Sequence, residues 1–192
     1  MKTKIKYGIV GSGLMGCEHI SNINLIDSAE VVAISDSNEN SINKAKNLIS
    51  NDIKIYSNNN EIFKNNEVDA FIISTPNFTH HDIIKEALKT KKHLLIEKPV
   101  CTKLEDCLEI KKLSTSYPSV IWVAMEYRYM PPVQKMIQEI DSNKIGKIKM
   151  LSIREHRFPF LKKVDDWNRF QINTGGTLVE KCCHFFDLMR LI

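Results

Sequence analysis

The stretch that decides the fold is Gly11-Ser12-Gly13-Leu14-Met15-Gly16, which directly follows the apolar run Ile5 to Val10. A G-x-G-x-x-G pattern between a strand and a helix is typical of a dinucleotide-binding turn. Gly11 permits the tight turn, Gly13 lets the backbone approach a pyrophosphate, and Gly16 lets the helix pack closely on the strand. The free amides of the helix would face the phosphates, so we expect Leu14 and Met15 in its first turn to line the same site.

Asp36 ends the next apolar run, roughly where a carboxylate meets the 2′-hydroxyl of an adenosine ribose in such folds. No arginine follows it to accept a 2′-phosphate, so NAD is favoured as the cofactor, with NADP as the alternative. The competing interpretation is that the glycines form only a strand-to-helix turn and that Asp36 begins an Asp-Ser-Asn turn. The glycine motif lies between a predicted strand and a predicted helix, and Asp36 follows at the expected distance, which together favour nucleotide binding.

Short apolar runs alternate with longer helix-period stretches from Lys4 to about Asp141. This alternation predicts an α/β fold with a Rossmann-type, doubly wound parallel sheet. The expected strands are 4–10, 30–35, 54–56, 68–74, 92–97 and 120–127. The expected helices are 14–26, 41–50, 79–90, 104–114 and 133–140.

The regular alternation stops after Gly146, where a strand-like segment, 147–154, begins. We therefore divide the chain into a nucleotide-binding domain, 1–128, and the N-terminal part of a second domain, 129–192. The last residues, Phe185 to Ile192, form an apolar helical stretch without a cap, a glycine stop or a polar tail. We interpret the second domain as incomplete, and the chain as a fragment or a truncated gene product.

Composition excludes several classes of protein. Of the 192 residues, 43% are hydrophobic and 26% are charged, which is typical of a globular chain. The sequence lacks both the roughly 18 consecutive apolar residues of a membrane helix and a signal peptide, so a cytoplasmic protein without membrane contact is expected. The net charge is +4, with lysines scattered among acids, which argues against a nucleic-acid partner. Five cysteines without dense spacing indicate reduced thiols.

Three further segments contain candidate functional residues. The first, Ser74-Thr75-Pro76-Asn77-Phe78-Thr79-His80, ends a predicted central strand, and the second, Glu97-Lys98-Pro99, ends the next one. Ligands of open α/β sheets bind at the carboxyl ends of the strands, so both segments belong to the expected site. The third, Gly175 to Asp187, is predicted to start a helix on which Glu180 and His184, four residues apart, share one face.

Together these motifs resemble the Gfo/Idh/MocA oxidoreductase family, which includes inositol and glucose-fructose type dehydrogenases. The resemblance also covers Tyr127-Arg128-Tyr129 with Pro131, and Gly146-Lys147-Ile148. It implies a nicotinamide-dependent dehydrogenase that transfers hydride between NAD(P) and a secondary alcohol or carbonyl of a sugar or polyol. It further implies that the second domain is α+β with a mainly antiparallel sheet, through which a homo-oligomer could form.

The resemblance also assigns roles to residues. Lys98 would lie beside the nicotinamide and hydrogen-bond the reacting oxygen, and Glu97 would help to hold the cofactor. The Lys98–Pro99 bond would be cis. His184 would be the general acid/base, and the cofactor would carry the hydride step. Members also contact the cofactor through the loop after the central strand, which here comprises Ser74, Thr75, Pro76, Asn77 and His80.

Glu180 departs from the family pattern, because many members have aspartate at this position. It keeps the charge and lengthens the side chain by one methylene, and we expect it to orient His184 or a substrate hydroxyl. Arg128 and Tyr129 are candidates for substrate contact. Their alternative role is to pack and form a salt bridge where the two domains join. Trp167 is a further candidate for substrate contact. Its alternative role, which is commoner for tryptophan, is packing in the core.

Alternative interpretations remain at two residues and for the whole chain. Lys98 would otherwise be a surface lysine at a turn, and His184 a packed core histidine. Adjacent Cys182 and Cys183 point about 100° apart on a helix, so no metal site is expected. The chain as a whole would otherwise be a catalytically weak nucleotide-binding protein that acts through an interaction surface, or an NADP-dependent reductase of a non-sugar carbonyl.

Overall fold

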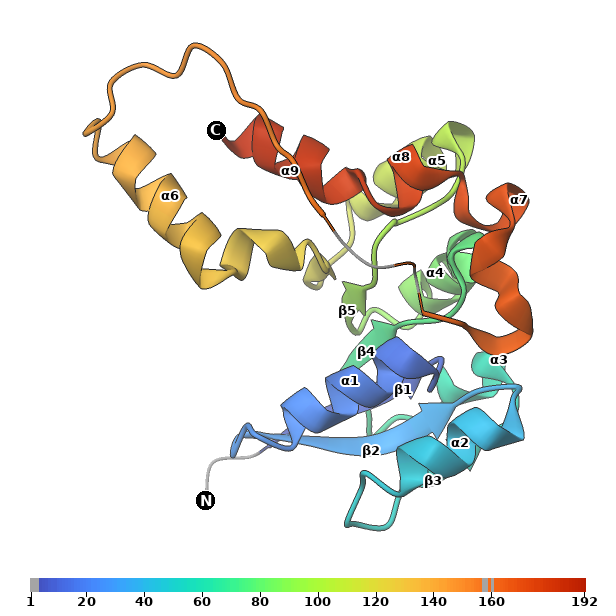
Figure 1. The fold of residues 1–192 in the computed structure, drawn as a ribbon. Helices are drawn as coiled ribbons and strands as arrows, with labels where there is room; N and C mark the ends of the chain where they lie inside the picture. Colours follow the sequence, from blue (N-terminus) through green and yellow to red (C-terminus); the bar gives the residue numbers. More distant parts are fainter. Residues whose placement is uncertain (1–3, 157–158, 160) are drawn as a thin grey trace.

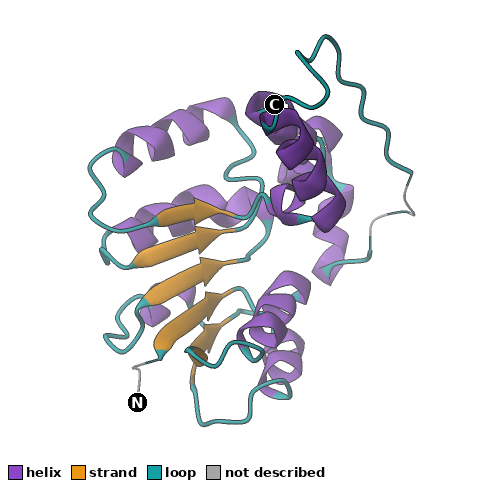
Figure 2. Ribbon diagram, turned by 90° about the vertical axis from the view of Figure 1, so that its left-hand side faces the viewer, coloured by secondary structure: helices purple, strands orange, loops and turns teal. Residues whose placement is uncertain are grey.

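The computed structural model describes residues 4–156, 159 and 161–192. Six strands form one parallel sheet in the order β3-β2-β1-β4-β5-β6, and Figure 2 shows them running in the same direction. The strands are β1 (Ile5–Val10), β2 (Ala29–Ser35), β3 (Lys54–Tyr56), β4 (Ala70–Ile73), β5 (His93–Ile96) and β6 (Ile121–Val123). This is the doubly wound Rossmann order, so the predicted sheet is confirmed.

Alternation along the central strands builds a core on each face of the sheet. In β1, Ile9 belongs to one apolar cluster together with Ile34 and Ile72, whereas its neighbour Val10 belongs to the other cluster. Successive side chains of a strand point to opposite faces, so a strand buried on both faces must be apolar throughout. Phe71 has no exposed surface and packs edge-to-face on Phe63 with ring centroids 5.0 Å apart.

Two sets of helices cover these cores. The first layer contains α1 (Leu14–Ile23) and α2 (Glu39–Lys46). The second layer contains α3 (Asn59–Ile62), α4 (His80–Leu88) and α5 (Leu104–Ser114). Asn38 caps α2 by accepting a hydrogen bond from the Ser41 amide at 3.0 Å, which satisfies one of the free donors at the start of a helix. The short 3-10 helix η1 (Asn77–Thr79) leads into α4.

The remaining described residues form helices and loops (Figure 1). Their elements are η2 (Glu126–Tyr129), α6 (Pro131–Asp141), η3 (Val164–Arg169), α7 (Gln171–Thr174), α8 (Thr177–Glu180) and α9 (Cys183–Leu191). The predicted strand at 147–154 was wrong, because this segment has no regular structure. A strand needs backbone hydrogen bonds from a neighbouring strand, and within the described ranges no strand pairs with this segment.

Smaller differences have local causes. Strand β6 ends at Val123, earlier than predicted, because the chain turns into η2 at Glu126. Helix α6 begins at Pro131 rather than at 133, since a proline fits the first turn of a helix, where its missing N–H is not needed.

Candidate active site

The glycine loop between β1 and α1 has three glycines in different situations. A Cβ on Gly11, whose φ is +89°, would lie 2.7 Å from the Thr75 amide nitrogen, and one on Gly16 would lie 2.2 Å from the Gly11 oxygen. Both positions therefore require glycine for the packing of the protein itself. A Cβ on Gly13 would meet nothing within 4 Å. The space over Gly13, at the start of α1, is open to a ligand.

Asp36 lies at the end of β2, directly beside this loop. One carboxylate oxygen accepts a hydrogen bond from the Ser12 amide at 2.8 Å, and the other accepts one from the Asn38 amide at 2.9 Å. A cavity of about 620 Å³ opens next to it, lined by Ser37, Ser57, Asn58, Asn59, Asn60, Asp82, Ile83, Lys85 and Glu86. The structure thus brings Asp36 and the glycine loop together at one edge of the sheet.

The segment after β4 faces the glycine loop. The Ser74 hydroxyl donates to the Gly11 carbonyl at 2.7 Å, which ties the two loops together. Pro76 precedes η1, and Thr75 and Asn77 are buried. The Asn77 Nδ2 group is buried and has no hydrogen-bond partner among the described residues. A buried donor without an acceptor is costly, so this amide is suited to an acceptor on a bound ligand.

His80 was expected to line the cofactor loop, and the structure gives it a different environment. The ring has no exposed surface; Nδ1 lies 2.8 Å from the Pro99 carbonyl oxygen and Nε2 lies 3.0 Å from the Thr75 carbonyl oxygen. Burial lowers the pKa of His80, although both backbone contacts act in the opposite direction. The side chain therefore links two loops from the inside of the protein.

Glu97 follows β5 and is buried. Its carboxylate lies 2.7 Å from His19 Nε2 of α1 and accepts a hydrogen bond from the Lys98 amide at 3.2 Å. Burial alone would raise the pKa of Glu97, but the hydrogen bond and charge of His19, with Lys98, bring it below its ordinary value. The Lys98–Pro99 bond is cis, as the family resemblance implied.

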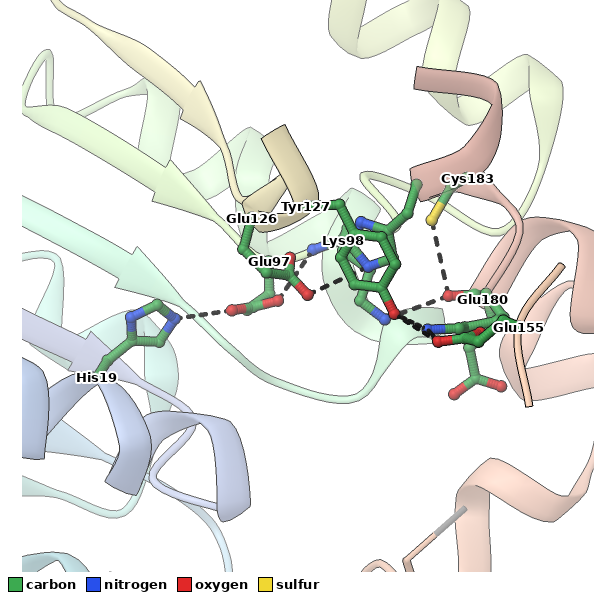
Figure 3. Close-up of polar contacts among 10 residues, drawn as sticks. His19, Glu97, Lys98, Glu126, Tyr127, Glu155, Glu180 and Cys183 are labelled. Atoms are coloured by element: carbon green, nitrogen blue, oxygen red, sulfur yellow. Dashed lines mark hydrogen bonds and ion pairs between the residues drawn. The ribbon is translucent and has the colours of Figure 1, made fainter. Parts of the chain in front are cut away.

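Lys98 extends from this turn towards the C-terminal helices. Its ammonium group donates to the main-chain oxygen of Glu180 at 3.2 Å (Figure 3). Lys163, which precedes η3, is partly buried near the same place, and burial followed by the charge of Lys98 lowers its pKa. A second cavity, of about 460 Å³, lies beside Glu180 and is lined by Asn168, Arg169, Gln171, Thr174, Gly175, Gly176, Thr177 and Leu178.

Glu180 and His184 do not share one face of a helix, so this prediction was wrong. Helix α8 ends at Glu180, and α9 begins at Cys183. Gly175 and Gly176 both have positive φ, and a Cβ on Gly175 would lie 2.9 Å from the Thr102 carbonyl oxygen, so the chain turns sharply there. Glu180 instead contributes its main-chain oxygen, which faces Lys98 in Figure 3.

His184 occurs at the start of α9, with 1% of its surface exposed. The ring stacks face-to-face on Tyr127, with centroids 4.2 Å apart and planes at 7°. Nε2 lies 3.3 Å from Glu126 Oε1, whereas Nδ1 has no partner among the described residues. Burial, reinforced by the positive charges of Lys98 and Lys181, lowers the pKa of His184 to about 4. The imidazole is therefore neutral at neutral pH and able to accept a proton.

Lys181 is buried between His184 and the loop before residue 157. Its ammonium group donates to the Tyr127 hydroxyl, lies 3.0 Å from Glu155 Oε1, and sits 4.5 Å from the centre of the Tyr127 ring. The Tyr127 hydroxyl in turn donates to Glu155 at 2.8 Å (Figure 3). These contacts fix the tyrosine ring on which His184 is stacked.

The three candidates for substrate contact have protein partners. The Arg128 guanidinium forms a bidentate ion pair with the Asp187 carboxylate. This is the salt-bridge role that was the alternative to substrate contact. Tyr129 is about half exposed, beside Trp122. Trp167 packs edge-to-face on Phe78, with ring centroids 6.4 Å apart.

Three side chains of this site were not predicted from the sequence: His19, Glu126 and Lys181. His19 follows Gly16 by three residues on α1 and so lies on the same side of the helix, which is a usable signal. Glu126 has no such signal, because it reaches His184 from 58 positions away in the sequence. The contact of Lys181 with Tyr127 likewise joins positions 54 residues apart.

Metal-binding clusters and membrane-spanning helices are both absent from the described part of the chain. Residues 4–156, 159 and 161–192 contain no group of three or more His, Cys, Asp or Glu side chains placed to bind a metal ion. Among the helices in these ranges, none is both long and apolar enough to cross a membrane.

Comparison with known proteins agrees with this geometry. Residues 5–125 match the NAD-binding Rossmann-fold domain of the Gfo/Idh/MocA oxidoreductase family, and residues 137–192 match its C-terminal alpha/beta domain. The chain is 29% identical over 193 residues to the uncharacterized oxidoreductase YrbE of Bacillus subtilis, covering 100% of this chain and 54% of that protein. It is 26% identical over 188 residues to myo-inositol 2-dehydrogenase of Thermotoga maritima, covering 98% of this chain and 54% of that protein.

A solved structure gives the same result. The crystal structure of myo-inositol dehydrogenase from Lactobacillus casei, in complex with NAD(H) and myo-inositol, matches with a TM-score of 0.70 and 28% identity. The match covers 75% of this chain and 43% of that chain. The chain spans about half the length of the curated relatives it matches. With its glycine loop, its Glu97-Lys98-Pro99 turn and a family model matched over most of its length, the chain belongs to the Gfo/Idh/MocA oxidoreductase family.

Proposed function

We propose that the chain binds NAD and supplies the proton-transfer groups of a dehydrogenase that acts on a secondary alcohol of a sugar or polyol. One observation carries this proposal: Lys98 follows β5 at the sheet edge where the glycine loop also lies, and its charge acts on a buried, neutral His184. An acid/base pair next to a dinucleotide turn suits oxidation of an alcohol, in which a hydride and a proton leave the same C–OH unit.

The residues present fit the cofactor. The open space over Gly13 suits a pyrophosphate at the start of α1, and the unpartnered Asn77 amide suits an acceptor group on the ligand. Asp36 would accept a hydrogen bond from the adenosine ribose, which favours NAD over NADP. Leu14 and Met15 are exposed in the first turn of α1 and would cover the dinucleotide. When bound, nicotinamide supplies the hydride chemistry.

Lys98 and His184 have separate tasks in this proposal. The Lys98 ammonium group would exchange the Glu180 carbonyl for the reacting oxygen of the substrate, where its charge stabilises the developing alkoxide. His184 would take the hydroxyl proton as a neutral base. Glu97, held by His19, fixes the backbone from which Lys98 extends.

The substrate class comes from the relatives. Several are dehydrogenases of inositols, and another is glucose-6-phosphate 3-dehydrogenase of Bacillus subtilis. A ring that carries several hydroxyl groups is common to these substrates. We therefore propose a cyclic polyol or a sugar, oxidised at one secondary alcohol.

The test is a fluorescence titration of the purified chain with NADH, together with turnover assays on a panel of inositols and sugars. Lys98→Ala should abolish turnover and change NADH affinity by less than about tenfold, or 1.4 kcal/mol. Lys103→Ala is the matched control, because Lys103 is an exposed lysine five residues away. NADH binding without turnover by the wild-type chain would instead support the weak nucleotide-binding alternative. Failure of the folded chain to bind NADH would refute the proposal.

A further inference from the structure

The two ring nitrogens of His184 have different surroundings. Nε2 faces the Glu126 carboxylate at 3.3 Å, and Nδ1 is buried without a partner among the described residues. The ring cannot turn over freely, because it is enclosed and stacked on Tyr127, which Lys181 holds in place. The orientation of the ring is thus determined by its packing.

This orientation selects one tautomer of the neutral ring. A carboxylate accepts hydrogen bonds and donates none, so Nε2 must carry the hydrogen where it faces Glu126. Nδ1 then has the free lone pair and is the basic atom. At 3.3 Å this contact is an ion-pair distance without hydrogen-bond geometry, and catalytic hydrogen bonds often form fully only when the substrate is bound.

Glu126 also connects His184 to solvent. It belongs to η2, and its side chain is 58% exposed, whereas that of His184 is 2% exposed. Burial lowers the pKa of His184 to about 4, and partial burial raises that of Glu126. A carboxylate beside Nε2 counters part of the cost of holding a proton on the enclosed ring, because an opposite charge nearby favours the charged form.

The charged groups around the pair come from several elements. Lys98 from the β5 turn and Lys181 from the α8–α9 junction disfavour a charged imidazole, whereas Glu97 and Asp187 favour it. At Glu126 the signs are reversed: Glu97 disfavours the ionised carboxylate, and Lys98 and Lys181 favour it. The positive charges therefore lower the proton affinity of both groups, which favours an ionised carboxylate beside a neutral ring.

We propose that Glu126 is the positioning residue of His184: it fixes the tautomer with Nδ1 as the base and stabilises the ring while the ring holds the substrate proton. The inference rests on the proposed dehydrogenase function. During oxidation the substrate O–H bond breaks and Nδ1–H forms, while the hydride takes both electrons of the C–H bond to the oxidised nicotinamide. Nε2–H stays directed at Glu126 Oε1, and the imidazolium gives the Nδ1 proton to water after the product leaves, which restores the starting tautomer.

The tautomer can be measured without turnover. In the chain labelled with ¹⁵N-histidine, the nitrogen chemical shifts distinguish protonated from unprotonated ring nitrogens, and the His184→Gln variant identifies the signals. We expect hydrogen on Nε2 in the wild-type chain, a mixture of tautomers in Glu126→Ala, and recovery in Glu126→Asp. Glu139→Ala is the matched control, since Glu139 lies on α6 and its side chain pairs with the surface lysines Lys135 and Lys144. Hydrogen on Nδ1 in the wild-type chain, or an unchanged spectrum in Glu126→Ala, would overturn the proposal.

Kinetics test the role of Glu126 during turnover. We expect Glu126→Ala to lower kcat at least about tenfold, because a positioned acid/base system contributes roughly 100-fold or more. NADH affinity should be unchanged, and added formate should restore part of the rate. An unchanged kcat in Glu126→Ala would refute the positioning role in turnover. If the wild-type chain binds no NADH or turns over no substrate, the proposed function fails, and the nitrogen shifts still decide the role of Glu126.

Discussion

Replacing Gly13 by aspartate separates ligand binding from folding. A side chain at this position meets no protein atom within 4 Å of its Cβ, and the backbone φ of −68° is accessible to any residue. Gly13 is also the N-cap of α1, a position at which aspartate is favoured. We therefore expect Gly13→Asp to keep the free energy of unfolding within about 1 kcal/mol of the wild-type value.

The same substitution should strongly weaken NADH binding. The new carboxylate would lie at the start of α1, where the pyrophosphate is expected. Two like charges about 5 Å apart repel by roughly 3 kcal/mol at an effective dielectric constant of about 20, which corresponds to a loss of more than about 100-fold. Gly13→Asn has almost the same shape without the charge, so the difference between the two variants isolates the electrostatic part.

The assay is a fluorescence titration with NADH, with thermal unfolding measured on the same samples. Gly16→Ala is the opposite control: its Cβ would lie 2.2 Å from the Gly11 oxygen, so it should lower the unfolding temperature. If Gly13→Asp folds normally and binds NADH within about threefold of the wild-type Kd, the pyrophosphate does not lie at this loop. The assignment of the glycine loop would then be wrong.

Three further predictions concern other parts of the chain. Asp36→Ala should reduce the preference for NADH over NADPH at least about tenfold in paired titrations, since it removes both the ribose acceptor and a negative charge. The pKa of His184 is lowered from 6.5 to about 4, so its contribution to stability is complete above pH 6.5 and is lost as the pH falls towards 4. Urea unfolding should show up to about 3 kcal/mol of this loss in the wild-type chain and less in His184→Gln. Phe71→Ala should cost about 3–5 kcal/mol in the same unfolding assay, because Phe71 is fully buried.

Each of these has a contradicting result. An unchanged NADH to NADPH ratio would remove Asp36 from the cofactor site. Equal pH dependence in the wild-type chain and in His184→Gln would show that the imidazole is not held neutral by burial. A loss below about 1 kcal/mol in Phe71→Ala would mean that the core around β4 refills the space.

The Rossmann half of the fold was predictable because its signals are local. The glycine loop, Asp36 and the Glu97-Lys98-Pro99 turn each follow a strand, and parallel strands bring their carboxyl ends to one edge. A pattern of about ten residues was therefore enough to place each segment. Only the exact ends of elements, such as β6, depended on contacts that the pattern does not contain.

The acid/base site was predictable only in part, because its contacts join distant segments. The spacing of Glu180 and His184 suggested one helix, but the helix is interrupted between the end of α8 and the start of α9. The partner of the imidazole is Glu126, which is 58 positions away in the sequence and belongs to another element. Likewise, the apolar residues of 147–154 favour a strand by themselves, but a strand also needs a partner.

The enclosed ring of His80 has a consequence for how this fold can change over time. The ring fills the space between the loops after β4 and β5, and its two nitrogens face main-chain carbonyl groups, those of Thr75 and Pro99. Every amino acid has such a carbonyl, so the side chains of both loops are free to be exchanged while the spacing persists. A chain built in this way can acquire a new substrate by altering the surface of these loops, without first having to rebuild the frame that supports them.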